Sequence, residues 1–378
     1  MEIFSNQTLR SRPHIAIFSS TKIGNFVITT PLLRGLKEKY PDCILDFFGS
    51  EITKDFEKNC PYIDWRFSLY NSSLDFLENL THAVKQRRQI AGDYDLAINC
   101  DQFSEINLVT ITALRPKYVV GAVLSPDFRL KIDPNNHPVQ KILNEKDWNS
   151  QEFLQRNKNI LKSNYIAEIF CRIAYVETDY FKLELPQSSP NFTVPDILIS
   201  TTATRPAKMW PANYWKQVIT WCRTQNLTVG LLGNTPKIQQ QLYYADNIET
   251  DILNDTDAID LRGKTSLTQL AGALAKAKAC LTIDTGTLHI AAAVGCPTVA
   301  IFGNNINGSG ASPIRLWSPR TPEITIAFSQ YNCTICEDNH FKNKSCAIEN
   351  HPCMKYLTPQ TAIDLLQLAL QPSPATVL

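Results

Sequence analysis

The chain has 378 residues, of which 44% are hydrophobic and 19% are charged, and its formal net charge is +1. A chain of this length and composition is globular and can bury the cores of two domains. Because its charges balance, there is no bulk electrostatic attraction to nucleic acid or to an anionic membrane. Residues 1–13 lack the apolar segment of a secretory signal, and no apolar run approaches the about 18 residues of a membrane span. We therefore expect a cytoplasmic protein whose closest association with a membrane is peripheral, at its inner face.

Apolar runs of strand length alternate with helical segments through the first half of the chain, which is typical of a parallel, doubly wound sheet. A helix follows the first run, and Pro31 is expected either to kink this helix or to mark its true start. Polar residues 126–158 indicate an insertion or mobile loops, and a helix around 160–175 closes this half. The expected strands cover residues 14–20, 45–48, 95–100 and 118–123.

A linker divides the chain, since residues 185–196 contain three prolines and two adjacent serines. The second half repeats the strand–helix alternation, with strands expected at 197–201, 228–232, 279–283 and 298–302. We predict an α/β protein with two Rossmann-type domains that face each other across a ligand-binding cleft. The expected parts are an amino-terminal domain 1–184, the linker 185–196, a carboxyl-terminal domain 197–357, and a helix and tail 358–378. The last helix is expected to pack back across the domain junction.

The most informative motif lies where the strand 279–283 turns into a helix that begins near Gly286. A glycine lets the backbone approach a ligand closely, and the free N–H groups of a helix start form an anion site. His289 could add a second donor, and Asp284 could accept hydrogen bonds from hydroxyls. The motif therefore favours a phosphate-bearing ligand; the alternative is an ordinary turn in which Asp284 serves as a helix cap.

Taken together, these residues and several distant motifs resemble the heptosyltransferases, glycosyltransferase family nine. The resemblance covers both halves, and only residues 60 to 195 lack clear landmarks. The matching segments are Asp284-Thr285-Gly286-x-x-His289 with Gly295, Pro297 and Phe302-Gly303; Ser19, Ile23-Gly24 and Thr30-Pro31-Leu32-Leu33; Lys208-Met209-Trp210-Pro211 with Trp215; Leu231-Leu232-Gly233; and Leu261 to Leu267.

The resemblance implies a GT-B-like fold in which the carboxyl-terminal domain binds an ADP-sugar and the amino-terminal domain binds the acceptor. It implies that Thr285 and Gly286 donate hydrogen bonds to the diphosphate and that Lys208 neutralises it. It also places Thr204, Asp284 and His289 in the donor pocket. Fixed N–H groups and an ammonium stabilise the charge that grows on a diphosphate leaving group, so catalysis needs no metal or other cofactor. The alternative for Lys208 is an ordinary solvated lysine.

The sequence departs from the family pattern at the position of the general base. There the family has an aspartate and this chain has Asn25, whose amide can orient a hydroxyl but cannot take its proton at useful rates. Asp101, just past the strand 95–100, is the candidate replacement, and family members that glycosylate bacterial adhesins place their base elsewhere in the amino-terminal domain. Three alternatives remain: Asp101 only caps a loop, Asn25 positions a nucleophile that needs little help, or the protein binds a nucleotide sugar without transferring it.

Four of the eleven cysteines cluster near the carboxyl end, as Cys333-x2-Cys336-x9-Cys346-x6-Cys353. This spacing predicts a closed tetrathiolate site for a structural metal, either zinc or a rubredoxin-like iron. Similar quartets occur in part of the resembled family, including its adhesin-modifying members. The alternative is four free thiols or a redox disulfide. We expect the other seven cysteines to be reduced and mostly buried.

The sequence thus predicts an inverting glycosyltransferase that moves a heptose or related sugar from ADP-heptose to a cell-envelope acceptor. The expected acceptor is lipopolysaccharide core, or alternatively another glycan or a protein. Two readings from other classes stay open. One is a catalytically impaired protein that binds nucleotide sugars, supported by Asn25 alone. The other is an epimerase, for which the expected cluster of acidic and histidine residues is not evident.

Overall fold

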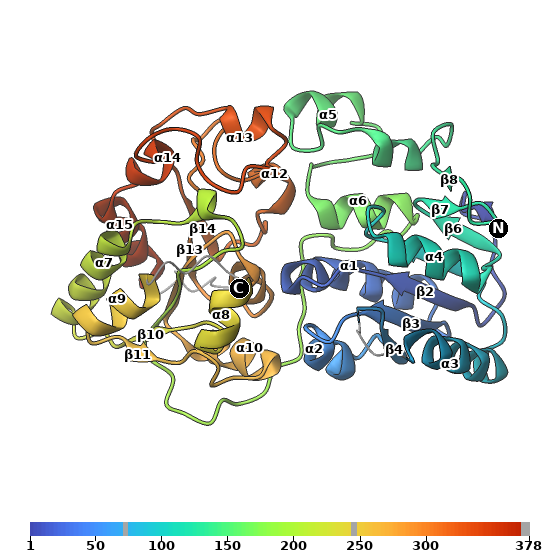
Figure 1. Ribbon diagram of the computed structural model, residues 1–378, viewed down its shortest axis with the longest axis horizontal. Helices are drawn as coiled ribbons and strands as arrows, with labels where there is room; N and C mark the ends of the chain where they lie inside the picture. The colour runs from blue at the N-terminus through green and yellow to red at the C-terminus, as the bar shows by residue number, and fades with distance from the viewer. Residues whose placement is uncertain (71–74, 243–247, 372–378) are drawn as a thin grey trace, which may run out of the picture. The chain divides into compact units, whose positions relative to one another are not determined.

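Two parallel β-sheets, each flanked by helices, organise the chain in the computed structural model, which describes residues 1–70, 75–242 and 248–371 (Figure 1). The contacts divide the chain into Met1–Pro186 and Gln187–Leu378, here called the N-unit and the C-unit. The division falls within the segment expected to be a linker. The predicted fold class, α/β with two Rossmann-type domains, is confirmed. Residues 372–378 of the expected tail lie outside the described residues.

The N-unit sheet has six parallel strands in the order β1-β6-β5-β2-β3-β4. Their bounds are β1 Glu2–Ile3, β6 Tyr118–Val120, β5 Leu96–Asn99, β2 His14–Phe18, β3 Ile44–Gly49 and β4 Trp65–Ser68. The fourth strand expected in this half, 118–123, is broken at Gly121, whose φ of 86° turns the chain. Beyond the turn, β7 (Val123–Leu124) instead pairs antiparallel with β8 (Lys131–Ile132).

Strict alternation of side chains sends the residues of β2 to two different helical layers. Ala16 and Phe18 belong to a core with Leu80 of one helix and Ile111 of another. On the other side, Phe26 packs edge-on against a β3 phenylalanine at 5.4 Å between ring centroids. The helices of this unit are α1 Ile23–Lys39, α2 Lys54–Asn59, α3 Phe76–Ala91, α4 Glu105–Leu114, the 3-10 helix η1 Gln140–Asn144, α5 Gln151–Arg156 and α6 Ile166–Ile173.

Pro31 does not mark the start of α1, as one of the two expectations had it, because the helix begins eight residues earlier, at Ile23. A proline inside a helix leaves the carbonyl four residues before it without its N–H partner. Here that carbonyl belongs to Val27, and the Thr30 hydroxyl donates to it at 2.7 Å. The side chain thus replaces the missing backbone donor, and the helix continues.

Residues 126–158 are built into the N-unit rather than forming only loops. They include β8, η1 and α5, and Gln140 of η1 is fully buried. Its amide donates to the carbonyl oxygen of Phe4 at 2.8 Å and accepts from the backbone N–H of Gly121 at 2.9 Å. These two bonds fasten the insertion to the edge of the sheet where β1 and β6 lie.

The C-unit sheet has the strand order β11-β10-β9-β12-β13-β14, again all parallel. Counted from β9, this is the 3-2-1-4-5-6 order of a Rossmann fold, with the direction of winding reversed between β9 and β12. The strand bounds are β9 Ile197–Ser200, β10 Val229–Leu231, β11 Ile259–Asp260, β12 Ala279–Ile283, β13 Thr298–Ile301 and β14 Ile324–Ala327. The helices are η2 Pro206–Lys208, α7 Ala212–Thr224, α8 Pro236–Leu242, α9 Ile248–Asp255, α10 Leu267–Lys276, α11 Gly286–Ala293, α12 Ile314–Trp317, α13 Ile335–Asp338, α14 Pro352–Lys355 and α15 Pro359–Ala369.

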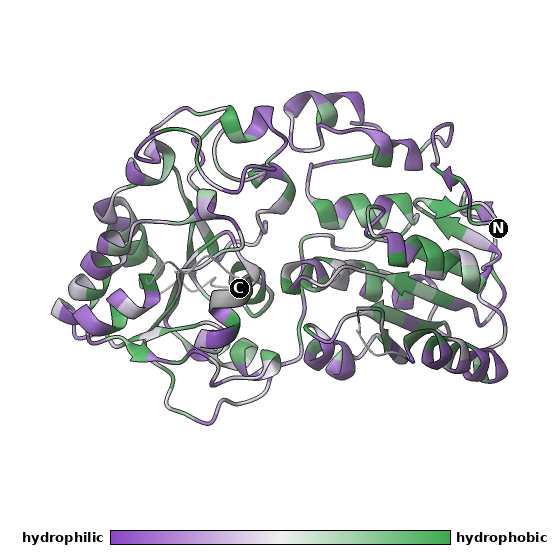
Figure 2. Cartoon of the chain, viewed as in Figure 1, coloured by the Kyte–Doolittle hydropathy of each residue, from purple (hydrophilic) through white to green (hydrophobic). Residues whose placement is uncertain are grey.

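Strand β13 shows how the C-unit sheet is covered on both faces. Val299 and Ile301 join the large core beneath α7, whereas Ala300 and Phe302 pack on the other face with Leu288 of α11. Figure 2 shows hydrophobic residues concentrated in the strands and hydrophilic residues spread over the surrounding helices. Within the described ranges, no helix has both the length and the apolar character needed to cross a bilayer.

The last helix, α15, was expected to cross the domain junction, but the contacts described for it lie within the C-unit. It packs against α7 and against strands β12, β13 and β14. Ala362, Ile363 and Leu366 bury one face of this helix in the same core as Trp215. The amphipathic pattern of the helix therefore matches the sheet of its own unit, which supplies the apolar surface that it covers.

We predict that Thr30→Val lowers the free energy of unfolding by about 1–3 kcal/mol, because two buried backbone groups lose their partner. The Thr30 hydroxyl donates to the carbonyl of Val27 and accepts from the N–H of Glu184 at 3.2 Å. Urea unfolding, with hydrogen exchange of α1 peptides, measures the effect. The control is Thr81→Val, which removes an exposed hydroxyl bonded to the carbonyl of Leu77. Equal losses in the two variants would contradict the argument.

Candidate functional site

The motif at Asp284 lies at the switch point of the C-unit sheet. Strand β12 ends at Ile283, its neighbour β9 ends at Ser200, and α11 begins at Gly286. Chain connections leave these two strands in opposite directions, so the carboxyl ends of β9 and β12 border a crevice of the kind that binds ligands in open α/β sheets. The predicted strand-to-helix corner is present, and it lies at the position where open α/β sheets usually bind ligands.

Thr285 is the N-cap of α11 and organises the first turn of the helix. Its side chain accepts from the N–H of Thr287 at 3.1 Å, and its carbonyl accepts from the N–H of Leu288 at 3.2 Å. The hydroxyl of Thr287 in turn donates to the hydroxyl of Ser200 at 3.2 Å, which ties the helix start to β9. The backbone N–H groups of Thr285 and Gly286 precede these bonds and are the donors that the sequence assigned to an anion.

Lys208 and Asp284 form an ion pair, with 2.5 Å between the ammonium Nζ and the carboxylate Oδ2. Asp284 is buried, and the Lys208 side chain is 18% exposed, so the ordinary solvated lysine is not what the structure shows. Burial alone would raise the pKa of Asp284. The charge and hydrogen bond of Lys208 outweigh that effect and hold the pKa below its usual value. Lys208 thus reaches the predicted corner, but it arrives already paired with a carboxylate.

His289 lies one turn into α11, where it is 3% exposed. Burial is the main cause that lowers its pKa to about 4; Asp284 opposes this shift and Lys208 adds to it. The imidazole is therefore neutral at physiological pH, with one donor and one acceptor nitrogen. Its buried Nδ1 has no hydrogen-bond partner within the described structure. The ring edge meets Trp317 at 6.5 Å between centroids.

Thr204, the remaining residue assigned to the donor pocket, lies between β9 and η2, and its side chain is exposed. Its neighbour Arg205 was not singled out from the sequence. The Arg205 guanidinium reaches the backbone of Asn343 and of Ala311, both more than 100 residues away. A local motif carries no information about partners so distant in the chain, and the only signal was the position of Arg205 three residues before Lys208.

Asp101 and Asn25 lie at the corresponding switch point of the N-unit. Asp101 follows β5, Asn25 lies in the first turn of α1 after β2, and β2 pairs with β5. Burial raises the pKa of Asp101, while the N–H of Phe103 and the charge of Lys22 act against this shift. Because Lys22 precedes α1 directly, Asp101 lies within electrostatic range of the helix start that carries Asn25. A raised pKa makes a carboxylate a stronger base.

Asn25 donates from its side-chain amide to the Ser20 hydroxyl at 2.5 Å. Asp101 is held from both sides: its N–H donates to the Asn99 side chain at 3.1 Å, and its carboxylate accepts from the N–H of Phe103 at 3.3 Å. The second contact is a loop cap, the alternative role that the sequence indicates for Asp101. It uses only one carboxylate oxygen, so loop capping and proton transfer are compatible roles for this residue.

The four clustered cysteines fall on irregular chain and short helices that follow β14. Cys336 lies in α13 and Cys353 in α14, and all eleven cysteines are free thiols. Burial raises the pKa of Cys353 to about 12, and Cys346, Cys333 and Cys336 push it in the same direction. The four sulfurs thus lie in one neighbourhood. In the part of the chain that the structure describes, however, no three histidine, cysteine or acidic side chains are placed to hold a metal ion.

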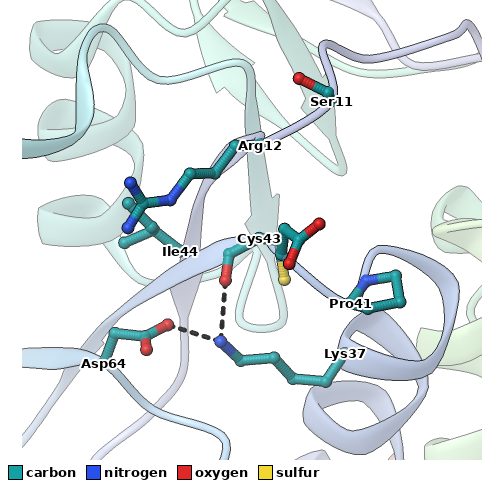
Figure 3. Close-up of a pocket in the computed structure, with 8 residues that line it drawn as sticks. Ser11, Arg12, Lys37, Pro41, Cys43, Ile44 and Asp64 are labelled. Atoms are coloured by element: carbon teal, nitrogen blue, oxygen red, sulfur yellow. Dashed lines mark hydrogen bonds and ion pairs between the residues drawn. The ribbon is translucent and has the colours of Figure 1, made fainter.

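Figure 3 shows a pocket in the N-unit that contains none of the predicted site residues. It lies at the amino-terminal ends of the strands, next to the start of β3, whereas Asp101 lies at their carboxyl ends. Inside it, the Lys37 ammonium donates to the carbonyl of Cys43 at 2.8 Å and to Asp64 at 2.7 Å. The lining residues are Ser11, Arg12, Lys37, Pro41, Asp42, Cys43, Ile44 and Asp64. The lysine of this pocket is already paired within the protein, and the pocket lies away from the carboxyl ends of the strands.

Comparisons with known proteins point to one family. The sequence model of glycosyltransferase family 9 (heptosyltransferase) matches residues 144–346. Lipopolysaccharide heptosyltransferase 3 of Escherichia coli strain K12 is 24% identical over 310 residues, which are 80% of this chain and 83% of that protein.

Two solved structures share the fold. A family 9 glycosyl transferase from Veillonella parvula has a TM-score of 0.67 at 16% identity, with 95% of this chain and 97% of that chain covered. The iron-containing, dodecameric heptosyltransferase TibC has a TM-score of 0.59 at 16% identity, with 96% of this chain and 77% of that chain covered. TibC was solved in complex with ADP-D-beta-D-heptose.

We predict that Lys208→Met destabilises the C-unit by roughly 3 kcal/mol at neutral pH, because it leaves the buried Asp284 carboxylate unpaired. In the folded wild type, the pKa of Asp284 lies below its value in the unfolded chain. The ion pair therefore contributes its full stabilisation above the unfolded-state pKa, and this stabilisation is lost as the pH falls through the folded-state pKa. The gap between variant and wild type should therefore shrink toward about pH 4, where an unpaired buried carboxyl is protonated. Thermal unfolding at several pH values measures it.

The matched control is Lys278→Met, which removes an ion pair to Asp196 made by a lysine that is 60% exposed. This change should cost at most about 1 kcal/mol at neutral pH. A Lys208 variant as stable as this control, or a gap that widens in acid, would contradict the pairing.

Proposed function

Since the chain belongs to glycosyltransferase family 9, the heptosyltransferases, we propose that it transfers a heptose from ADP-heptose to a cell-envelope saccharide, with lipopolysaccharide core as the acceptor. The observation that carries this proposal is the corner formed by Lys208, Asp284 and the start of α11 at the C-unit switch point. The relative from Escherichia coli strain K12 described above is a lipopolysaccharide heptosyltransferase. A binding protein without transfer, an epimerase and a protein acceptor are not favoured.

The donor diphosphate would bind at this corner. The N–H groups of Thr285 and Gly286 lie at the positive end of the α11 dipole, and Lys208 supplies a full positive charge beside them. When the bond from the sugar to the diphosphate breaks, negative charge grows on the leaving oxygen. Fixed donors stabilise the transition state, which carries that charge, more than they stabilise the ground state. Removing one such donor raises the activation free energy by about 3 kcal/mol. The residues that we assign to the donor pocket are Thr204, Lys208, Asp284, Thr285, Gly286 and His289.

Activation of the acceptor falls to Asp101 in this proposal. Its raised pKa and its single internal hydrogen bond leave one carboxylate oxygen to take the proton of the attacking hydroxyl. Asn25, whose amide already donates to Ser20, has its carbonyl oxygen available to orient that hydroxyl. A single displacement with a carboxylate base on the acceptor inverts the sugar configuration. The residues above supply both charge stabilisation and proton transfer, so no catalytic cofactor is required.

Metal binding at Cys333, Cys336, Cys346 and Cys353 is a separate proposal with a structural role. Four thiols are the donor set of a tetrathiolate site for iron or zinc, and TibC is iron-containing. The described side chains do not form such a site as they stand, because no three of them are placed to hold an ion. Support therefore comes from the sequence spacing and from the mutual effect of the thiols on their pKa values.

We also propose a cytoplasmic location for this reaction, at the inner face of the membrane. All eleven cysteines are free thiols, which is the usual state in a reducing compartment. The partners of the protein are then a nucleotide-sugar donor and a glycan acceptor. Nucleic acid is not expected to bind, because the net charge is +1.

We predict that Asp101→Asn lowers the rate of acceptor-dependent ADP release by about 10²-fold or more, because the amide cannot accept the proton. The assay mixes ADP-heptose with a core acceptor and follows ADP. Since the pKa of Asp101 is raised, wild-type kcat/KM should fall as pH drops through that value, and the variant should lose this acid limb. Asn25→Ala should cost less. Full activity in Asp101→Asn would remove Asp101 from its role, and no ADP release by wild type would overturn the transfer function.

We predict about one iron or zinc ion per purified chain, measured by elemental analysis, and its loss in Cys336→Ser. The control is Cys43→Ser, which changes a buried thiol of the N-unit outside the quartet and should leave the metal content unchanged. Iron would add visible thiolate-to-iron absorption, whereas zinc would not. Metal-free wild-type protein would leave the quartet as free thiols.

A further inference from the structure

The segment 333–353, which carries the cysteine quartet, packs directly against the turn that carries Lys208. The N–H of Ala207 donates to the carbonyl of Lys344 at 3.0 Å. The carbonyl of Ala207 lies 3.0 Å from Nε2 of His351, within hydrogen-bond distance. Ala207 directly precedes Lys208 in η2, so both polar backbone groups next to the lysine are engaged by this one segment.

Arg205 makes a second connection between the same parts. Its Nε donates to the carbonyl of Asn343 at 2.7 Å, its Nη1 donates to the carbonyl of Ala311 at 3.3 Å, and its Nη2 lies 3.9 Å from Sγ of Cys336. The carbonyl of Arg205 accepts from the N–H of Lys208 at 3.0 Å, which closes the η2 turn. One planar guanidinium therefore bridges the turn, the loop after β13 and the cysteine segment.

We propose that Arg205 is a positioning residue for donor binding, acting through Lys208. Lysine has a flexible four-carbon stem, and fixing its ammonium at one point costs conformational entropy. That cost is smaller when the backbone at the base of the lysine stem is already fixed. The three side-chain contacts of Arg205 and the two backbone hydrogen bonds of Ala207 together fix this backbone. Small misplacements of a charged group weaken its interaction with a ligand strongly. The proposal rests on the donor site described above.

Arg205 is better suited to this role than to direct contact with the diphosphate. Each of its three nitrogens makes a contact within the protein, so three of its five N–H donors are already used there. The Lys208 ammonium, in contrast, lies at the corner itself, beside Asp284 and the start of α11. The arrangement also assigns the cysteine segment a function at the donor site, because residues Asn343, Lys344 and His351 form part of the support for Lys208.

A double-mutant cycle on ADP affinity tests the proposal. Calorimetry measures the dissociation constant for ADP in wild type, Arg205→Met, Lys208→Met and the double variant. If Arg205 acts through Lys208, Arg205→Met weakens binding about tenfold in the wild-type background and less than about twofold in the Lys208→Met background. Equal effects in both backgrounds would overturn the proposal, because a residue that only stabilises the fold does not need Lys208.

Two further variants keep the result interpretable. Arg205→Lys retains a charge and one donor, so it should recover part of the lost affinity while remaining as folded as wild type by thermal unfolding. Arg223→Met removes an exposed arginine near the end of α7, which lies at the amino-terminal ends of the C-unit strands, away from the corner at Asp284. This variant should leave ADP affinity unchanged. If Arg205→Met fails to fold, Arg205→Lys in the two Lys208 backgrounds gives the same cycle. If Lys208→Met binds ADP as wild type does, the donor site itself is wrong; if it binds more weakly but Arg205 is additive, only the present proposal fails.

Discussion

The ion pair between Lys208 and Asp284 is the constraint on which the donor corner depends. Asp284 ends a buried strand, where an uncompensated carboxylate would be costly, and its partner arrives from a turn 76 residues earlier in the chain. The pair therefore fixes the distance between η2 and β12. It also leaves the corner nearly neutral before any ligand binds, and in this setting the buried His289 stays uncharged. An entering anion then meets donors whose directions are already set.

The candidate site residues of both units lie at the same topological point, the carboxyl ends of the two central strands. In the C-unit, Asp284 directly follows the central strand β12, and Ser200 is the last residue of its neighbour β9. In the N-unit, Asp101 follows β5, and Asn25 lies just beyond β2. Each unit has a carboxylate at this position; one is paired with a lysine, and the other has a raised pKa. In the reaction that we propose, these different surroundings assign the paired carboxylate to electrostatics and the other to proton transfer.

Local patterns predicted the central strands and the strand-to-helix corner, because a buried parallel strand is a continuous apolar run that can be read without its neighbours. They missed the edge strands β1, β4, β11 and β14, which are only partly buried and lack such runs. They also left open whether Pro31 begins α1 or lies within it, which depends on a threonine hydroxyl, and they could not reveal the core that α15 covers in its own unit. The partners of Arg205 lie more than 100 residues away, so no local signal could reveal them. Sequence spacing likewise placed the four thiols together but could not settle their geometry.

The position of α15 in the chain has a consequence for biosynthesis. This helix is the last element of the described residues, and its apolar face completes the core that contains Trp215 and the strands β12–β14. The N-unit leaves the ribosome before α15 does, so the N-unit can fold while the C-unit core is still uncovered. During this interval the nascent second half exposes a broad apolar face. We expect chaperone engagement during synthesis to concentrate there.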